Sequence, residues 1–447
     1  MSKKLFLITS ALCGVTACSG DSLNVRNPND PDVDRAYATP ALVEGVFAGF
    51  GVLMNNPQRA SESVNTQSKV LSGENFASVA NFGMAARAAI PRSIISNELG
   101  NDSQVGNVAN WNSFSITSRT AANAIRALRI LISQGKSLGS PAQDARALSF
   151  GFYTMGLALG DLSLAYDSAA IVSPQLEGSA IPELSSAVAV NKAAIAYLDT
   201  AVAIASSAGA TTGGNGFPFP SNWISSPTSI TQAYFIRLVR SQRARLRAGV
   251  ARNAAQRAAV DWAAVIADAT NGIQADHQVA IGGTTGWNAT YDVVQSYVTG
   301  GWSQLPMYYF GMADTSGSYG AWLNSPRDSR TGFTVLTADK RWPSGATRAA
   351  QQAVNANNNL PAGQYIRNRL SGDDVPVVGW GNSQYDHRRW GSVNINSNTG
   401  NYTDLSVTEV DMLAAEGYIR TGNIPAAAAL IDKSRVRNGL SSVAGVI

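Results

Sequence analysis

Apolar residues recur at every third or fourth position over most of this chain, which is the spacing of an amphipathic α-helix. Alternating patterns typical of β-strands are few. The pattern predicts helices at roughly Thr39–Met54, Met84–Leu99, Thr117–Gln134, Pro141–Leu159, Ala187–Ser206, Ser229–Val250, Ala254–Gly272 and Leu405–Thr421, with a last one starting near Ile424. We therefore expect a mainly α fold.

The clearest helical pair lies near the end of the sequence, where residues 407–421 are followed closely by residues 424–431. Gly422 and Asn423 end the first helix, Asn423 can cap the second, and Pro425 is tolerated in the first turn of that helix. This arrangement is typical of a tetratricopeptide-like hairpin. Similar pairs are 229–250 with 254–272 and 141–159 with 187–206. The irregular spacing between pairs argues against a simple uninterrupted solenoid.

The segment from about residue 275 to residue 404, here called the insert, is rich in Gly, Asn, Ser, Trp and Tyr and has little helical periodicity. Six of the nine tryptophans lie in it, at Trp287, Trp302, Trp322, Trp342, Trp380 and Trp390. Because it is too long for an ordinary loop, we expect a structured, irregular, aromatic-rich insertion on the helical scaffold. Irregular segments on rigid scaffolds often carry binding sites.

The N-terminus has the pattern of a signal peptide. Two lysines in Met1–Lys4 precede the uncharged apolar run Leu5–Ala17, which is too short to remain as a membrane-spanning helix. Residues 15–18, Val-Thr-Ala-Cys, resemble a bacterial lipobox, in which the cysteine is lipid-modified and becomes the new N-terminus. We expect cleavage after residue 17 and lipidation of Cys18. The alternative is ordinary cleavage near Ala17 with Cys18 as a bystander.

Residues 18–38 are polar and contain Asn27-Pro28 and Asp30-Pro31, so they are expected to form an extended tether before a helical domain at 39–447. After cleavage Cys18 is the only cysteine, so no internal disulfide can form. Charged residues make up 14% of the sequence, where about a quarter is usual, and removing Lys3 and Lys4 lowers the net charge from +4 to +2. A surface of hydroxyls and amides suits an uncharged polar ligand.

Two segments resemble the SusD/RagB family of outer-membrane nutrient-binding lipoproteins. Residues 145–164 are similar to the family's aromatic-rich helix that closes on a Gly-Asp turn, here Gly160-Asp161. Residues 409–440 are similar to its final tetratricopeptide unit and close on Arg-Asn-Gly-Leu. Two departures are that Gly417 stands where alanine is usual, and that family members usually continue with another helical region beyond the point where this sequence ends, Ile447.

The resemblance implies a lipid-anchored protein of the outer membrane, facing outward, that binds a nutrient and does not transform it. It also implies that the ligand, most often an oligosaccharide, is handed to a TonB-dependent, SusC-like transporter. Three alternatives remain open, which are a peptide-binding homologue, a surface glycan hydrolase, and a helical-repeat scaffold without a small ligand.

A glycan site needs flat aromatic faces beside groups that hydrogen-bond to hydroxyls. The insert has two clusters of this kind, and an early loop contains a weaker third candidate. The candidate ligand-binding residues are Trp287, Asn288 and Tyr291, then Trp302, Gln304, Tyr308 and Tyr309, and finally Trp111 with its neighbours Asn110 and Asn112. The competing interpretation is that these aromatic side chains form the core of a segment that has few aliphatic residues.

The sequence has no motif with a defined catalytic geometry, and we expect no cofactor and no metal ion. His277 and His387 are the only histidines, and neither has the spacing of a metal ligand or lies beside a nucleophile motif. Asp373-Asp374 and Asp386 could contribute carboxylates to a glycosidase, but the sequence does not determine their separation. We therefore predict a binding protein.

Arginines concentrate in residues 237–252, as they do in some nucleic-acid-binding helices. Arg240, Arg243 and Arg247 share one helix face, whereas Arg245 points elsewhere. This spacing favours a solvated helix face with local salt links, and we expect no nucleic-acid partner.

Overall fold

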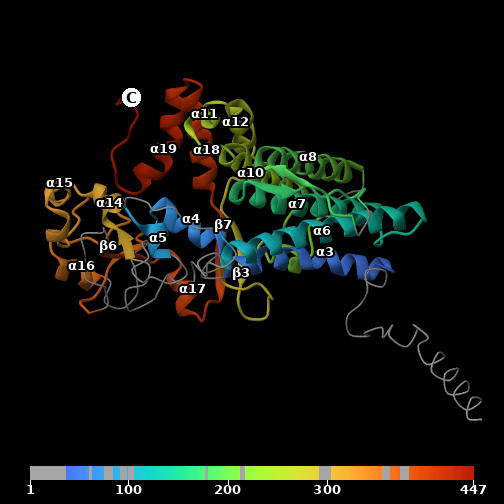
Figure 1. Ribbon diagram of the computed structural model, residues 1–447, viewed down its shortest axis with the longest axis horizontal. Helices are drawn as coiled ribbons and strands as arrows, with labels where there is room; N and C mark the ends of the chain where they lie inside the picture. Colours follow the sequence, from blue (N-terminus) through green and yellow to red (C-terminus); the bar gives the residue numbers. More distant parts are fainter. Residues whose placement is uncertain are drawn as a thin grey trace, which may run out of the picture.

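The structure is a computed structural model that describes residues 37–59, 63–74, 84–90, 98, 105–176, 180–211, 217–290, 304–354, 363–372 and 382–446. Cys18, Tyr291 and Trp302 lie outside the described residues, as do Asp373 and Asp374. The fold is mainly helical, as predicted. The helical bundle fills one end of the molecule and much of the insert the other (Figure 1).

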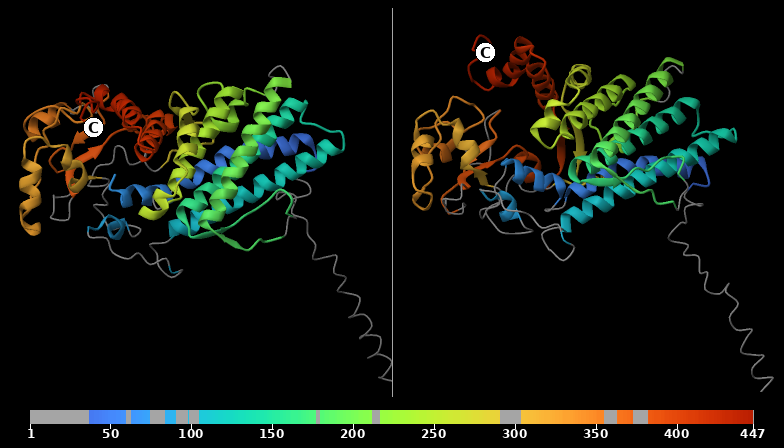
Figure 2. Two further views of the ribbon diagram at one scale, coloured as in Figure 1. Left: turned by 90° about the horizontal axis from the view of Figure 1, so that it is seen from above. Right: turned by 45° about the horizontal axis from the view of Figure 1, so that its top comes forward.

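Four long helices lie side by side in the bundle (Figures 1 and 2). They are α3 (Pro40–Asn55), α6 (Val105–Ser133), α7 (Pro141–Ala165) and α8 (Ala187–Thr211). Ser140 caps α7 by accepting a hydrogen bond from the Gln143 backbone N–H. By length and composition α7 and α8 could each cross a membrane, and 78% of the most apolar window of α7 is buried against 28% for α8. The apolar character of α7 is therefore that of a central core helix.

Aromatic side chains fill the centre of the bundle. Phe150 of α7 is 2% exposed, and its ring centroid lies 5.4 Å from those of Phe219 and Trp223 and 6.1 Å from that of Phe50. Stacked and edge-on ring pairs at these separations add to the free energy gained by burying their apolar area. The bundle is thus held by a continuous apolar core.

Shorter elements connect or cover the bundle. They are η2 (Asn56–Arg59), α4 (Val64–Ser72), α5 (Met84–Ala88), the antiparallel strands β1 (Ser168–Ala170) and β2 (Leu184–Ser186), and α9 (Ser221–Ile224). The prediction for α6 was wrong at its start, because the helix begins at Val105 and not at Thr117. Its first turns are rich in asparagine, and one of these, Asn110, accepts a hydrogen bond from the Val64 backbone N–H at 2.7 Å.

The second helical layer contains α10 (Gln232–Gly249), α11 (Ala254–Ala258), α12 (Trp262–Thr270), α18 (Val407–Arg420) and α19 (Ile424–Arg437). The pair α18–α19 confirms the predicted final hairpin, with Asn423 capping α19. The single helix predicted for residues 254–272 was wrong, because the chain forms two helices there. Asp261 lies between these two helices and caps α12, because its side chain accepts a hydrogen bond from the Ala264 backbone N–H.

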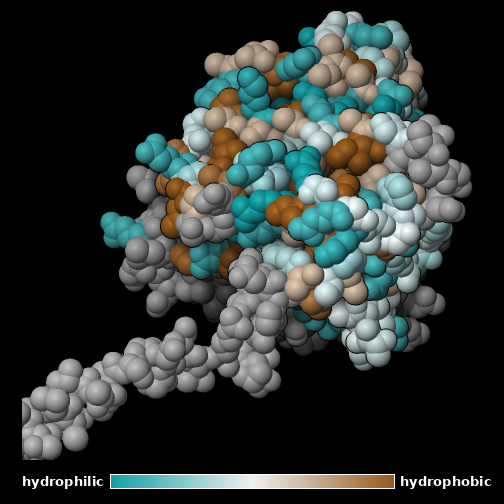
Figure 3. Space-filling view, turned by 90° about the vertical axis from the view of Figure 1, so that its right-hand side faces the viewer, coloured by the Kyte–Doolittle hydropathy of each residue, from teal (hydrophilic) through white to brown (hydrophobic). Residues whose placement is uncertain are grey.

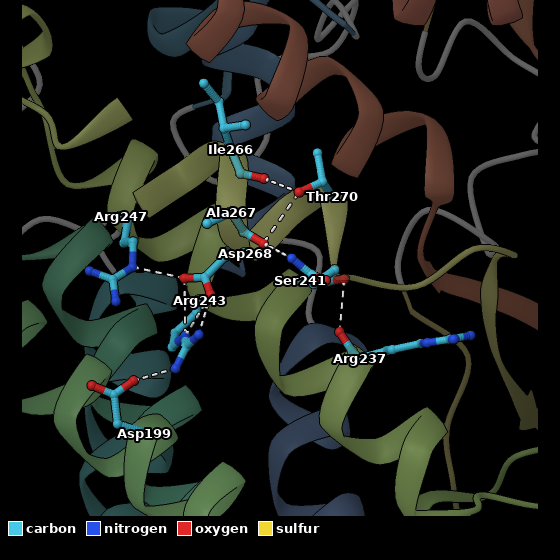
Figure 4. Close-up of polar contacts among 10 residues, drawn as sticks. Asp199, Arg237, Ser241, Arg243, Arg247, Ile266, Ala267, Asp268 and Thr270 are labelled. Carbon is cyan, nitrogen blue, oxygen red and sulfur yellow. Dashed lines mark hydrogen bonds and ion pairs between the residues drawn. The ribbon is translucent and has the colours of Figure 1, made fainter. Parts of the chain in front are cut away.

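Arginines of α10 bind carboxylates of neighbouring helices (Figure 4). Asp268 of α12 is buried and accepts hydrogen bonds from Arg243 Nε at 3.0 Å and Arg247 Nε at 2.9 Å. Arg243 also pairs with Asp199 of α8, and Arg245 binds Glu409 of α18 through two hydrogen bonds of 2.6 and 2.7 Å. These arginines therefore join helices of this protein. The predicted salt links are present, but the predicted solvated face is wrong, because Arg243 packs against α8 and α12.

Two small sheets organise the insert. Strand β3 (His277–Ile281) pairs antiparallel with β7 (Gly400–Leu405), and a three-stranded antiparallel sheet has the order β4-β6-β5. The strands of that sheet are β4 (Gln304–Pro306), β6 (Asn382–His387) and β5 (Ile366–Asn368). The short helices are α14 (Met307–Phe310), η4 (Gly311–Ala313), α15 (Ser318–Asn324), η5 (Arg327–Ser329), α16 (Arg348–Val354) and α17 (Gly391–Ile395).

The surface of the bundle end is mixed in character. In Figure 3 hydrophobic residues form separate spots among hydrophilic ones, without one continuous hydrophobic field on the coloured part of this face. Scattered exposed apolar residues of this kind are usual for folded proteins.

Candidate functional site

Trp287 is a core residue in this structure. Its side chain is 8% exposed and packs with Val279, Ile281 and Tyr402 of the two paired strands. Gly51 of α3 makes this possible, because a Cβ atom at that position would clash with the Trp287 ring and with the Trp223 carbonyl oxygen. The ring therefore joins the insert to α3, as in the competing core interpretation, and offers no open face to a ligand.

Next to Trp287, three asparagines form a hydrogen-bonded group that we call the amide cluster. Asn55 Nδ2 donates to the Asn288 backbone oxygen at 2.8 Å, and Asn288 Nδ2 donates to Asn56 Oδ1 at 2.9 Å. Asn55 is buried, Asn288 is half-buried and Asn56 is exposed. The end of α3 thus holds the predicted ligand residue Asn288 at the surface beside two further amides.

Two other predicted residues have structural partners. Gln304 is fully buried in β4, and its Nε2 donates to the Ser383 backbone oxygen in the neighbouring strand. The ring of Tyr308 lies edge-on to Trp322 with centroids 4.9 Å apart, and the Arg330 guanidinium packs over both rings. Their polar groups are thus engaged within the insert, although Tyr308 remains half-buried.

Tyr309 differs from the other predicted aromatic residues because its side chain is 40% exposed. Among the residues that the structure describes, it is the most exposed aromatic side chain. The ring lies against Gly73, the left-handed residue with φ +79° that ends α4, where a Cβ atom would clash with the Tyr309 ring. Glycine at this position therefore lets the ring pack on the backbone while its outer part stays accessible.

Helix α4 follows the amide-cluster residue Asn56 along the chain and ends beside Tyr309. It begins at Val64 and ends at Ser72, next to Gly73, on which the Tyr309 ring packs. Nine helical residues span about 13 Å, which is the scale of two or three sugar units. Leu71 of this helix is 37% exposed. We call the surface formed by the amide cluster, α4 and Tyr309 the α4 strip.

Trp111, the third candidate, lies on α6 and is half-buried. Its ring lies edge-on to that of Tyr166, with centroids 5.0 Å apart, and the Tyr166 hydroxyl donates to the Asn107 backbone oxygen at 2.5 Å. The neighbouring Asn110 is buried and anchors α4, whereas Asn112 is exposed. This group therefore positions the start of α4 through the hydrogen bond to Asn110.

A charged junction between the bundle and the insert was not identified from the sequence. Burial raises the pKa of Asp161 on α7 to about 7, with nearby Asp404 adding to the rise and Arg245 opposing it. His277 is buried, its Nδ1 lies 3.0 Å from the Tyr234 hydroxyl, and burial lowers its pKa. The proximity of Asp161 to Asp404 of β7 could not be seen in sequence, because the two residues are far apart along the chain.

The described residues contain no group of three or more His, Cys, Asp or Glu side chains that could hold a metal ion. Asp386, a carboxylate considered for hydrolysis, is buried and accepts a hydrogen bond from Arg367 Nε at 3.0 Å. Its geometry is that of a structural ion pair. Hydrolysis therefore has no support from Asp386.

No family model matches this sequence, and no curated protein matches it. Solved structures do match. A protein titled surface glycan-binding protein A from Bacteroides uniformis is 12% identical, with 91% of this chain and 82% of that chain covered and a TM-score of 0.54. A SusD superfamily protein from Bacteroides thetaiotaomicron is 12% identical with the same coverage and a TM-score of 0.51.

A SusD-like protein from Bacteroides fragilis is also 12% identical. The match covers 92% of this chain and 82% of that protein, with a TM-score of 0.50. At this level of identity the similarity concerns the fold. The chain therefore has the SusD-like fold that its sequence segments resemble.

Proposed function

We propose that this protein of SusD-like fold binds an oligosaccharide along the α4 strip. The observation that carries the proposal is the exposed ring of Tyr309, packed on Gly73 and connected by α4 to the amide cluster. A neighbour of the same fold is titled a glycan-binding protein. Fold alone is a weak argument for function, so the strip is the stronger support.

The chemistry of the strip suits a neutral sugar chain. Sugar rings have apolar C–H faces that pack on an aromatic ring, and hydroxyl rims that exchange hydrogen bonds with amides. Tyr309 supplies the ring, while Asn56 and Asn288 supply amides at the other end of α4. Amides can both donate to and accept from hydroxyls, so they recognise a hydroxyl pair without requiring a charge on the ligand.

The proposal includes delivery to a partner. We infer that Cys18 carries the lipid anchor in the outer membrane, that the protein faces outward, and that it hands its ligand to a TonB-dependent, SusC-like transporter. The lipobox-like residues 15–18 and the polar tether support the anchor. A single acyl chain holds a protein only marginally, so permanent attachment requires more than one.

The direct test is affinity electrophoresis of the chain beginning after Cys18 in gels that contain neutral polysaccharides. The variant Tyr309→Ala is expected to weaken retardation about tenfold, because it removes the stacking face. Tyr309→Phe keeps that face and should retain binding. Met312→Ala, at a neighbouring residue that is 62% exposed, is the matched control.

Two further variants connect the test to the predicted residues. Asn288→Ala should weaken binding by losing an amide, and Trp302→Ala tests a predicted residue outside the described part of the chain. Circular dichroism establishes that each variant is folded. Absence of retardation across the panel by the folded parent protein would contradict the proposal and favour a scaffold without a small ligand.

A further inference from the structure

The loop between α8 and α10 forms a partly open pocket apart from the α4 strip, with a volume of about 240 Å³. We propose that this pocket, here called the loop pocket, binds a single neutral sugar ring. The inference shares its ligand class with the proposed function but does not depend on the strip, so the two can fail separately.

The walls of the loop pocket combine apolar and hydroxyl groups. Phe219, Ile224 and Ile230 are each at most 5% exposed and form its apolar base. Two prolines, Pro220 and Pro227, also line the pocket, together with four hydroxyl side chains, Ser221, Ser226, Thr228 and Ser229. Apolar and hydroxyl groups in one pocket match a pyranose, which has an apolar C–H face and hydroxyls around its edge.

No charged side chain lines the loop pocket. A carboxylate or phosphate ligand would lose its hydration there without gaining a charged partner, which is costly. A neutral ligand exchanges hydrogen bonds to water for hydrogen bonds to serine and threonine hydroxyls. The lining therefore selects against acidic sugars.

The size of the pocket limits the ligand to one ring. Sites for drug-sized ligands have volumes of roughly 300–1,000 Å³, and the loop pocket is smaller. A longer chain would have to leave the pocket after its first unit. We infer that the pocket takes a monosaccharide or the end of an oligosaccharide.

Hydrogen bonds within the loop and to its neighbours fix the shape of the pocket. The Phe219 backbone N–H donates to the Ile230 oxygen at 3.2 Å and closes the loop. Ser225 Oγ donates to the Ala280 oxygen at 2.7 Å, and the Ala280 N–H donates back to the Ser225 oxygen at 2.6 Å. A loop already held in one conformation loses little freedom on binding, which favours affinity.

The loop pocket and the α4 strip are attached to the same part of α3. Within the loop, the Trp223 carbonyl oxygen packs against Gly51, and Trp287 packs against the same glycine. Asn55 of the amide cluster lies one helical turn further along α3. Both binding surfaces therefore depend on the C-terminal half of this helix, although they use different side chains.

The test is saturation-transfer NMR on the chain beginning after Cys18, with glucose, galactose and mannose as neutral probes and glucuronate as the acidic one. Ser229→Trp places a large side chain at the exposed rim and should abolish the signal of the neutral sugar that binds. Thr228→Val removes one hydroxyl at constant shape and should at least halve the signal. Circular dichroism checks the fold of each variant.

Comparison with Tyr309→Ala separates this pocket from the strip. The proposal expects the monosaccharide signal to survive Tyr309→Ala and to be lost in Ser229→Trp. A signal lost in Tyr309→Ala but retained in Ser229→Trp would overturn the loop pocket and support the strip alone. Absence of any monosaccharide signal, or equal binding of glucuronate, would also overturn it.

Discussion

The bundle and the insert have different interiors. Around Phe150, the centre of the bundle consists of aliphatic and aromatic side chains. In the insert an apolar cluster around Trp342 adjoins buried polar groups, where Gln351 accepts hydrogen bonds from Asn368 Nδ2 at 3.0 Å and from the Tyr385 hydroxyl at 2.7 Å. The insert also buries charge, since Asp386 and Arg367 are 4% and 6% exposed.

The comparison shows how each region obtains a defined structure. Apolar packing depends on volume and tolerates exchanges between side chains of similar size. A buried polar network depends on direction and on every partner being present, because an unsatisfied group in the interior costs free energy. Single polar substitutions within this network should therefore have larger effects than exchanges between apolar side chains of similar size around Phe150.

Phe150→Ala should give the largest effect and tests the apolar side of the comparison. Removing this ring from between Phe50, Phe219 and Trp223 is expected to lower the free energy of unfolding by about 3–5 kcal/mol. Urea denaturation followed by circular dichroism measures it. Leu42→Ala, at a residue that is 49% exposed on α3, is the control and should change stability by less than about 0.5 kcal/mol.

Asp386→Asn tests the polar side. It removes the negative charge that faces Arg367 and Arg369 while keeping the shape of the side chain, so a loss of about 2–3 kcal/mol is expected. The matched control is Asp328→Asn, because Asp328 pairs with Arg327 at the exposed surface, where the loss should stay below about 1 kcal/mol. Equal effects of the two substitutions would contradict the buried ion pair.

Asp161→Asn tests the junction between the two regions and should have the smallest effect, one that depends on pH. The pKa of Asp161 is raised to about 7, mainly by burial, so the folded state holds a proton that the unfolded state releases near pH 4. Its contribution to stability is complete below about pH 4 and is lost as the pH rises through about 7.

The variant should therefore lose part of the decline in stability between about pH 5 and pH 8. The midpoint of urea denaturation at each of the two pH values measures this decline in stability. The effect of the substitution should be small, because Asp161 is only half-buried. An unchanged pH dependence would place the titrating group elsewhere. His277 should contribute a pH dependence of opposite sign, because burial lowers its pKa and its contribution to stability is lost as the pH falls.

Sequence reasoning predicted the regular parts of the fold well. The starts of α3, α7, α8, α18 and α19 follow from apolar spacing and from local capping residues such as Asn423. The predicted end of α7 was wrong, because the helix continues through the expected Gly160-Asp161 turn to Ala165. The interior of the insert could not be predicted, because a partner such as Ser383 for Gln304 lies 79 residues away. Buried glutamines and arginines also look like surface residues in sequence.

The candidate site was only partly visible in sequence for a similar reason. Asn288 and Tyr309 were identified from composition, and the structure places both at the surface. Trp287 was identified by the same criterion but is buried, because the space beside Gly51 accepts its ring. Nothing near Trp287 in sequence shows that a glycine of α3 faces it.

The amide cluster also has a consequence for the order in which the protein assembles. Asn55 and Asn288 are 233 residues apart, so their hydrogen bond closes a very long loop. Contacts of such high sequence separation are slow to form, because the chain loses conformational entropy before the contact compensates for it. The first helix of the bundle can be complete well before the surface at its end exists. A ligand that requires this surface would therefore bind late in folding. By binding only the folded state, it would favour the docking of Asn288 against the end of α3.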